Sequence, residues 1–102
     1  MIARTWRGWT SAADADRYAD YVNETGVRGL GATEGDRGVY MLRRIDRDRA
    51  EFIVLSLWES LDAIKAFAGD DIDKAVFYPE DDDFLVEREW TCLHYEVPVA
   101  SR

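Results

Sequence analysis

Apolar and polar positions alternate along two stretches in a way that predicts β-strands. Residues 2–9 are rich in β-branched and aromatic types, and they place Arg4 and Trp6 on one face and Arg7 on the other. Residues 52–58 carry apolar side chains on both faces, because side chains in a strand alternate with period two. One layer of helices covers only one face of a small sheet, so the other face of this strand needs a separate partner. The two faces consist of Phe52, Val54 and Trp58, and of Ile53, Leu55 and Leu57.

Two helices are predicted from capping residues and from apolar residues three and four positions apart. Ser11 begins the first, with Asp14 three residues on, and Gly26 ends it. Ser60 begins the second helix and Gly69 ends it. The predicted apolar faces are Ala15, Tyr18, Ala19 and Val22 in the first helix, and Leu61, Ile64, Phe67 and Ala68 in the second.

The remaining segments complete a small sheet. A strand at 38–47 and the strand described above, joined by a polar turn at 46–49, predict an antiparallel hairpin. A short turn or helix is expected at 70–77, an exposed acidic loop at 80–83, and a long last strand at 84–97. In this strand Glu87, Arg88 and Glu89 interrupt the apolar pattern, as an edge or a bulge would. Residues 27–37, with three glycines, are expected to form a flexible connection.

The element order is therefore β-α-β-β-α-β, the ferredoxin-like α+β plan with an antiparallel four-stranded sheet and both helices on one face. Residues 1–99 are expected to form a single domain and residues 100–102 a C-terminal tail. Because the second face of the third strand has no cover within the chain, we expect a symmetric homodimer that packs sheet against sheet.

Composition and charge narrow the function classes. The chain has 102 residues and a net charge of −8, with +1 in residues 1–50 (nine Arg, eight acids) and −9 in residues 51–102 (four basic residues, thirteen acids). This balance argues against nucleic acid and anionic membranes as partners. No run approaches the length of a membrane helix. The single cysteine, Cys92, cannot form an internal disulfide, so a cytoplasmic location is expected.

Several short segments together resemble the antibiotic biosynthesis monooxygenase-like proteins (the ABM domain) of the dimeric α+β barrel superfamily. The resemblance covers nearly the whole chain and implies a dimeric α+β barrel. Members include cofactor-independent quinol or polyketide oxygenases, haem-degrading enzymes and many proteins of unknown role. The segments are Trp58-Glu59-Ser60, Ala63-Ile64, Phe67-Ala68-Gly69-Asp70-Asp71, Ala75-Val76, Tyr78-Pro79-Glu80-Asp81 and His94-Tyr95-Glu96-Val97.

The polar residues of active members can be compared with this chain one by one. The polyketide oxygenases carry an Asn four residues before the strand-ending Trp; here that Trp is Trp58 and the Asn position is Val54. The haem-degrading enzymes use an Asn on the first strand, a Trp in the later helix and a His beyond it. The matching positions lie near Arg7, Phe67, and Phe77 or Tyr78, so haem degradation is not expected and no cofactor is predicted.

The candidate catalytic residues are His94 and Arg7. His94, the only imidazole, is a candidate general base; otherwise it hydrogen-bonds a carboxylate or lies at the dimer interface. The arginines of the first strand either pair with acids at the sheet margin or point into a pocket as an anion contact. The residues expected to line a pocket for a small aromatic ligand are Trp6, Tyr40, Trp58, Phe67, Tyr78 and Trp90.

Two other kinds of site find little support. Cys92 and His94 share a strand face, but nothing supplies the third group that a Cys–His nucleophile needs. The acids at 71–73 lack the Gly and late Glu of a calcium loop, and those at 80–83 are expected to be solvated, so no metal is predicted.

Two hypotheses about function remain. The first is a cofactor-independent monooxygenase-like enzyme that acts on a small aromatic or quinol. The second, favoured by the missing Asn and helical His, is a non-catalytic small-ligand-binding or structural homodimer. An apolar cavity with His94 or an arginine pointing into it would favour the first, and a cavity filled by Trp and Phe side chains would exclude it.

Overall fold

The computed structural model describes residues 1–27 and 34–101. Most of the predicted glycine-containing connection, including Gly29 and Gly31, lies outside the described residues. The strands are β1 (Ile2–Ser11), β2 (Asp36–Asp46), β3 (Arg49–Trp58), β4 (Leu85–Arg88) and β5 (Leu93–Glu96). The helical segments are η1 (Ala12–Asp14), α1 (Ala15–Val22), η2 (Asn23–Val27), α3 (Leu61–Ala68) and α4 (Asp81–Phe84).

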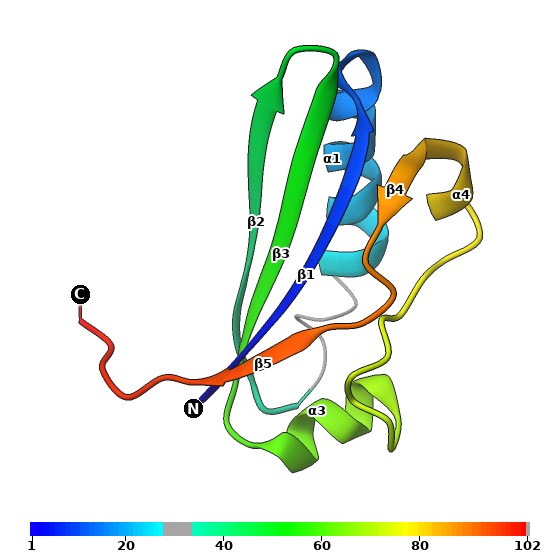
Figure 1. Ribbon diagram of the computed structural model, residues 1–102. Helices are drawn as coiled ribbons and strands as arrows, with labels where there is room; N and C mark the ends of the chain where they lie inside the picture. The colour runs from blue at the N-terminus through cyan, green and yellow to red at the C-terminus, as the bar shows by residue number, and fades with distance from the viewer. Residues whose placement is uncertain (28–33, 102) are drawn as a thin grey trace.

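The strands form one antiparallel sheet in the order β2-β3-β1-β4, with β5 also paired to β1. This arrangement confirms the predicted ferredoxin-like α+β plan. Figure 1 shows α1 along one face of the sheet and α3 across the end where β3 finishes. The register pairs Trp6 with Val54 and Arg7 with Ile53, so successive pairs face alternately toward the helices and away from them.

Caps fix both helices at the predicted residues. The Ser11 hydroxyl accepts from the Asp14 N–H at 3.3 Å, and the Ser60 hydroxyl accepts from the Ala63 N–H at 3.2 Å. Gly69 ends α3 with φ 89°, a left-handed conformation that suits glycine. The first helix does not stop at Gly26 as predicted, because one π-helical turn, η2, continues α1 through Val27.

The core confirms the two-faced pattern of β3. Phe52 packs with Tyr18 of α1, and Trp58 packs with Ile64 of α3; all four are fully or almost fully buried. Leu61, predicted on the buried face of α3, is instead exposed, because it lies in the first turn beyond the edge of the sheet. On the face of the sheet away from the helices, several large apolar side chains are exposed or half-buried: Tyr40, Leu42, Ile53, Leu55, Leu57, Leu93 and Tyr95.

The predicted long last strand is broken in two. β4 and β5 pair with the same edge of β1. Between them Glu89 still donates its N–H to the Arg7 carbonyl at 2.9 Å, whereas residues 90–92 leave the ladder and bond to the segment at 73–75. The interruption explains why five strands are present instead of four. The break begins at Glu89, whose N–H still bonds to β1 but whose carbonyl oxygen accepts the Trp6 indole N–H at 2.7 Å.

The predicted exposed loop at 80–83 is also corrected. Asp81–Phe84 forms the one-turn helix α4, and Asp81 is buried, with 6% of its surface exposed. One carboxylate oxygen of Asp81 accepts the backbone N–H of Tyr78 at 2.8 Å, which closes the turn and draws the acid inward. Between Gly69 and this turn the chain forms only a turn at 72–73 and an isolated bridge from Lys74 to Thr91.

Candidate functional site

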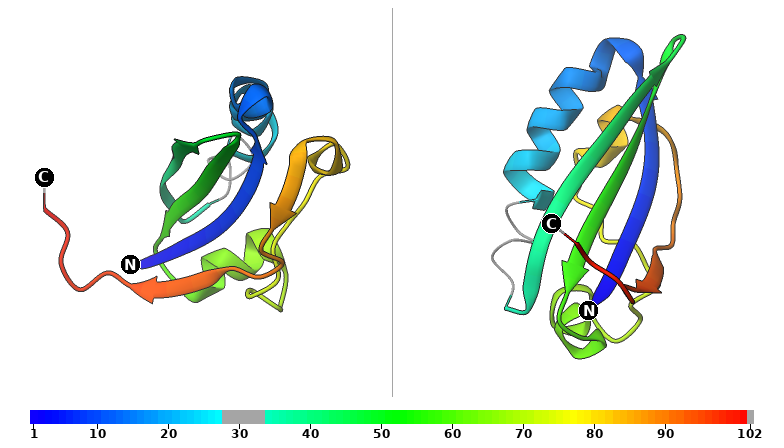
Figure 2. Two further views of the ribbon diagram at one scale, coloured as in Figure 1. Left: turned by 45° about the horizontal axis from the view of Figure 1, so that its top comes forward. Right: turned by 90° about the vertical axis from the view of Figure 1, so that its left-hand side faces the viewer.

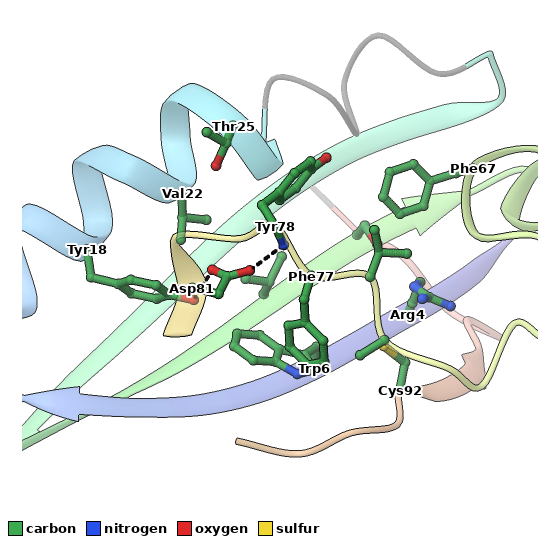
Figure 3. Close-up of a pocket in the computed structure, with 14 residues that line it drawn as sticks. Arg4, Trp6, Tyr18, Val22, Thr25, Phe67, Phe77, Tyr78, Asp81 and Cys92 are labelled. Carbon is green, nitrogen blue, oxygen red and sulfur yellow. Dashed lines mark hydrogen bonds between the residues drawn. The ribbon is translucent and has the colours of Figure 1, made fainter. Parts of the chain in front are cut away.

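A cavity of about 80 Å³ lies between the helix-facing side of the sheet and the segments that cover it. Most of its wall is apolar, and its polar groups lie at two ends (Figure 3). β1 and β3 form the floor, α1 with η2 one side, and residues 75–81 the roof, while Phe67 of α3 and Cys92 complete the wall. Residues that line the cavity include Arg4, Trp6, Val54, Phe67, Phe77, Tyr78, Asp81 and Cys92.

Trp6 forms the aromatic centre of the floor. Its ring lies over Gly8, where an added Cβ would come within 2.4 Å of the indole, so only glycine leaves room for this orientation. The indole N–H is fixed by the Glu89 carbonyl, and Phe77 packs edge-on against the ring at a centroid distance of 5.8 Å. Figure 3 shows Trp6 and Phe77 between the two polar ends of the cavity.

Asp81 forms one polar end. The buried hydroxyl of Tyr18 donates to a carboxylate oxygen of Asp81 at 3.4 Å, while the other oxygen accepts from Tyr78 N–H. Burial raises the pKa of the Asp81 carboxyl, and the two hydrogen bonds and Arg88 oppose the shift without cancelling it. Burial also raises the pKa of Tyr18, so its phenol keeps its proton. Asp81 is therefore a more basic carboxylate than a solvated one.

Arg4 forms the other polar end. Only 5% of its surface is exposed, and its guanidinium donates to the carbonyl oxygens of Ile72 and, at 3.2 Å, Lys74. The Arg4 Nη1 also lies 2.9 Å from His94 Nε2. On its other side, His94 places Nδ1 3.4 Å from a carboxylate oxygen of Asp73. The three side chains form a line from the protein surface to the cavity.

The hydrogen bonds between Asp73, His94 and Arg4 agree with a neutral His94. Burial lowers the pKa of His94, and the neighbouring Arg4 lowers it further against the smaller opposing effect of Asp73. A neutral His94 accepts from Arg4 at Nε2 and donates from Nδ1 to Asp73. Burial also lowers the pKa of Arg4, yet a guanidinium keeps its charge at neutral pH. Burial raises the pKa of the Cys92 thiol, which therefore remains neutral beside it.

Three of the predicted pocket residues line the cavity: Trp6, Phe67 and Tyr78. Trp58 lies one layer behind them, fully buried, with its ring centroid 5.9 Å from that of Phe67. Its indole N–H donates to the Ser56 hydroxyl at 2.8 Å, and Ser56 itself lines the cavity. Trp58 thus supports the wall without reaching the space inside.

The structure places the other predicted residues elsewhere. Tyr40 is 58% exposed on the sheet face away from the helices, and Trp90 is 66% exposed against Phe77. Arg7 lies on the face away from the helices and bridges Glu89 at 2.9 Å. His94 stands behind Arg4 rather than in the wall. Catalytic roles for His94 and Arg7 stay predictions.

Arg4 and Asp81 are the polar groups that our choice of site residues missed. The alternation of side chains in β1 places Arg4 on the same face as Trp6 and Arg7 on the opposite face. The sequence pattern therefore already indicated that Arg4 could line the same cavity as Trp6. Asp81 had no such signal, because a run of four acids is typical of a solvated loop. Only its local turn and the approach of Tyr18 bury it.

The cavity does not fit a haem. The chain has a single histidine, His94, and it lies outside the described wall with both ring nitrogens engaged. A volume of about 80 Å³ is also smaller than the roughly 150 Å³ cavity that holds a benzene ring. Within residues 1–27 and 34–101, no group of three or more His, Cys, Asp or Glu side chains is placed to hold a metal ion.

Comparison with solved structures shows the same fold in other proteins. A Bacillus cereus protein assigned as an antibiotic biosynthesis monooxygenase superposes with a TM-score of 0.70 at 16% identity, over 99% of this chain and 96% of the other. The haem degrader MhuD from Mycobacterium tuberculosis, with two haems bound in its active site, superposes with a TM-score of 0.63 at 17% identity over 100% of both chains.

These comparisons confirm, at the level of the fold, the resemblance predicted from the sequence. No model of a known protein family matches the chain, and no curated protein matches its sequence. In the part of the chain that the structure describes, no helix is long and apolar enough to span a bilayer.

Proposed function

We propose that the protein is a monooxygenase-like enzyme that binds a small hydroxylated aromatic, such as a quinol, in this cavity and needs no bound cofactor. The observation that carries the proposal is the cavity itself: an aromatic wall with a buried arginine at one end and a buried carboxylate at the other. The fold shared with an assigned monooxygenase supports the reaction class. A quinol supplies its own electrons: one oxygen atom of O₂ enters the ring and the other leaves as water, which yields a hydroxyquinone.

Asp81 and Arg4 have complementary roles in this proposal. Asp81 is the proton acceptor for the phenol, because burial makes its carboxylate more basic than a solvated one. Arg4 faces the oxygen at the far end of the ring and stabilises the negative charge that proton removal creates. Trp6 and Phe77 stack around the ring and keep water from the reacting carbon.

The size of the cavity limits the ligand. At about 80 Å³ the space is roughly half of what holds a benzene ring, so a single ring enters only when a wall side chain moves. Phe77 and Tyr78 are the side chains placed to move, since they belong to a connection without helix or strand. We therefore propose ligands with one aromatic ring and small substituents.

The same proposal includes a homodimer formed through the sheet face away from the helices. This face presents Tyr40, Leu55 and Leu93 in one register row across the sheet, and neither Tyr40 nor Leu93 is covered by the chain itself. The C-terminal residues extend away from the body of the subunit (Figures 1 and 2). An uncovered apolar sheet face of this kind is typical of a subunit interface.

Oxygen uptake with a panel of substituted hydroquinones tests the activity. We expect uptake by the metal-free protein that is saturable in the quinol and is lost in Asp81→Asn but kept in the control Asp83→Asn, an exposed acid two residues away. Uptake by wild type that equals the background oxidation of every quinol would refute the proposal.

A second candidate, ligand binding without catalysis, has one observation in its favour. Both oxygens of Asp81 already accept hydrogen bonds, from Tyr18 and from Tyr78 N–H, as in a purely structural cap. Quenching of the protein's Trp fluorescence by a quinol distinguishes the two candidates: binding without oxygen uptake identifies the non-catalytic protein.

A further inference from the structure

The Arg4 guanidinium is a buried charge without a carboxylate partner. Within the described residues, no Asp or Glu oxygen is within ion-pair distance of Arg4, although its side chain is almost fully enclosed. Buried charges in proteins are normally paired. The arginines that do pair with a carboxylate lie in more exposed positions: Arg7, Arg17, Arg37, Arg43, Arg44, Arg49 and Arg88.

The groups around Arg4 fix its position without neutralising it. The carbonyl oxygens of Ile72 and Lys74 accept from its Nη atoms, and the His94 ring accepts from Nη1. Each of these acceptors is uncharged when His94 is neutral. Cys92, the other polar group beside Arg4 in the wall, keeps its proton because burial raises the pKa of its thiol. The positive charge therefore remains available to whatever fills the cavity.

The line from Asp73 through His94 to Arg4 explains how the guanidinium is aimed. The Nδ1–H of His94 donates to the Asp73 carboxylate at 3.4 Å, which leaves Nε2 as an acceptor for Arg4 at 2.9 Å. The register of the sheet supports this arrangement, since Arg4 and His94 are directly paired across β1 and β5. Arg4 from β1 and Asp73 from the connection after α3 are the charged groups that bear on His94.

We infer that the Arg4 end of the cavity is a recognition site for an anionic group on the ligand, a ring carboxylate or an acidic phenolate. His94 acts as a positioning residue that holds the guanidinium in place. This inference rests on the proposed aromatic-binding cavity and specifies its ligand class: a hydroxylated aromatic acid binds with its anion at Arg4 and its ring against Trp6. A charged ligand supplies the missing partner of the buried arginine.

Paired ligands of equal shape test the inference. We expect 4-hydroxybenzoate to bind about tenfold or more tightly than the neutral 4-hydroxybenzamide, measured by calorimetry or by Trp fluorescence at one ionic strength. In Arg4→Gln the two ligands should bind equally. The control Arg44→Gln, which alters an exposed arginine of β2 outside the cavity wall, should keep the full preference.

The pH dependence of ligand affinity tests the positioning role of His94 separately. In wild type the affinity for 4-hydroxybenzoate should weaken as the pH falls through the pKa of the folded-state His94, which burial lowers below its ordinary value, because a protonated His94 cannot accept from Arg4. His94→Gln, whose amide oxygen can replace Nε2 as acceptor, should bind with little pH dependence over this interval. His94→Ala should lose most of the preference for the anion.

The outcomes separate this inference from the proposed function. Equal affinity of wild type for the acid and the amide overturns the anion site but not the proposed aromatic cavity. In that case Arg4 has only a structural role, as a donor to the carbonyl oxygens of Ile72 and Lys74. A clear preference for the acid, with no oxygen uptake on any quinol, keeps the anion site and overturns the enzymatic proposal. No binding of either ligand to the folded protein overturns both. If Arg4→Gln does not fold, the comparison of the two ligands on wild type and on His94→Ala still decides the case.

Discussion

The hydroxyl of Tyr18 in α1 lies 3.4 Å from a carboxylate oxygen of Asp81 in α4, and both groups are buried. This contact joins the first helix to the segment that roofs the cavity. It predicts that Tyr18→Phe leaves Asp81 with one fewer buried donor and lowers the free energy of unfolding by about 1–2 kcal/mol. Urea unfolding measures the change. The neighbouring Tyr21→Phe, which loses only an exposed contact to Glu80, should change stability by less than about 0.5 kcal/mol.

A larger side chain at a roof residue should fill the cavity. Ala75 lines the space, and Ala75→Leu should occupy much of the 80 Å³ with its longer side chain. We expect affinity for any aromatic ligand to fall about tenfold or more, with little loss of stability because the added methyl groups enter empty space. Ala66→Leu on the exposed side of α3 is the matched control and should bind like wild type. Undiminished affinity in Ala75→Leu would place the ligand elsewhere.

The proposed dimer predicts a clean change in mass. Leu55 lies on the sheet face away from the helices, between the register partners Thr5 and Tyr40. Light scattering should give twice the subunit mass for wild type and the single subunit mass for Leu55→Asp, since a charge buried in an interface is strongly unfavourable. Leu61→Asp on exposed α3 should remain dimeric. A monomeric wild type at micromolar concentration would contradict the interface.

Stability should depend on pH through His94. Its folded pKa lies below the ordinary value of 6.5, so between these two values the unfolded chain binds more protons than the folded one. The stabilising contribution is therefore complete above about pH 6.5 and is lost as the pH falls toward the folded pKa. Urea unfolding from pH 7.5 to about 5 should show a steeper decline for wild type than for His94→Gln. Parallel curves would show that His94 does not titrate differently on folding.

The fold followed from the sequence because each element carried a local signal. Ser11, Ser60 and Gly69 marked helix ends, and the two-faced apolar pattern of β3 required helices on one side. These signals are local or strictly periodic, so the chain alone determines them. At the break between β4 and β5, the charged residues Glu87, Arg88 and Glu89 indicated only an edge or a bulge. The full interruption depends on the indole of Trp6, on a distant strand, donating to the Glu89 carbonyl.

The candidate site was predictable only in part. Trp6, Phe67 and Tyr78 were chosen for their size and type, which is what an apolar wall selects. The alternation in β1 separated Arg4 from Arg7 and placed Arg4 on the face of Trp6, but only the structure shows that the helices cover this face. The burial of Asp81 depends on Tyr18, which is 63 residues away in the chain. Tertiary contacts of this kind cannot be read from composition or spacing.

The break at 89–92 separates the pairing of the last strands with β1 from the shaping of the cavity wall, which a continuous strand would combine. β4 and β5 pair with β1 on either side of the break, while residues 90–92 leave the β1 ladder and place Cys92 in the cavity wall. Substitutions there can reshape the wall without shifting a strand. The interruption is thus a natural place for libraries that diversify ligand preference, since the scaffold on either side can fold unchanged.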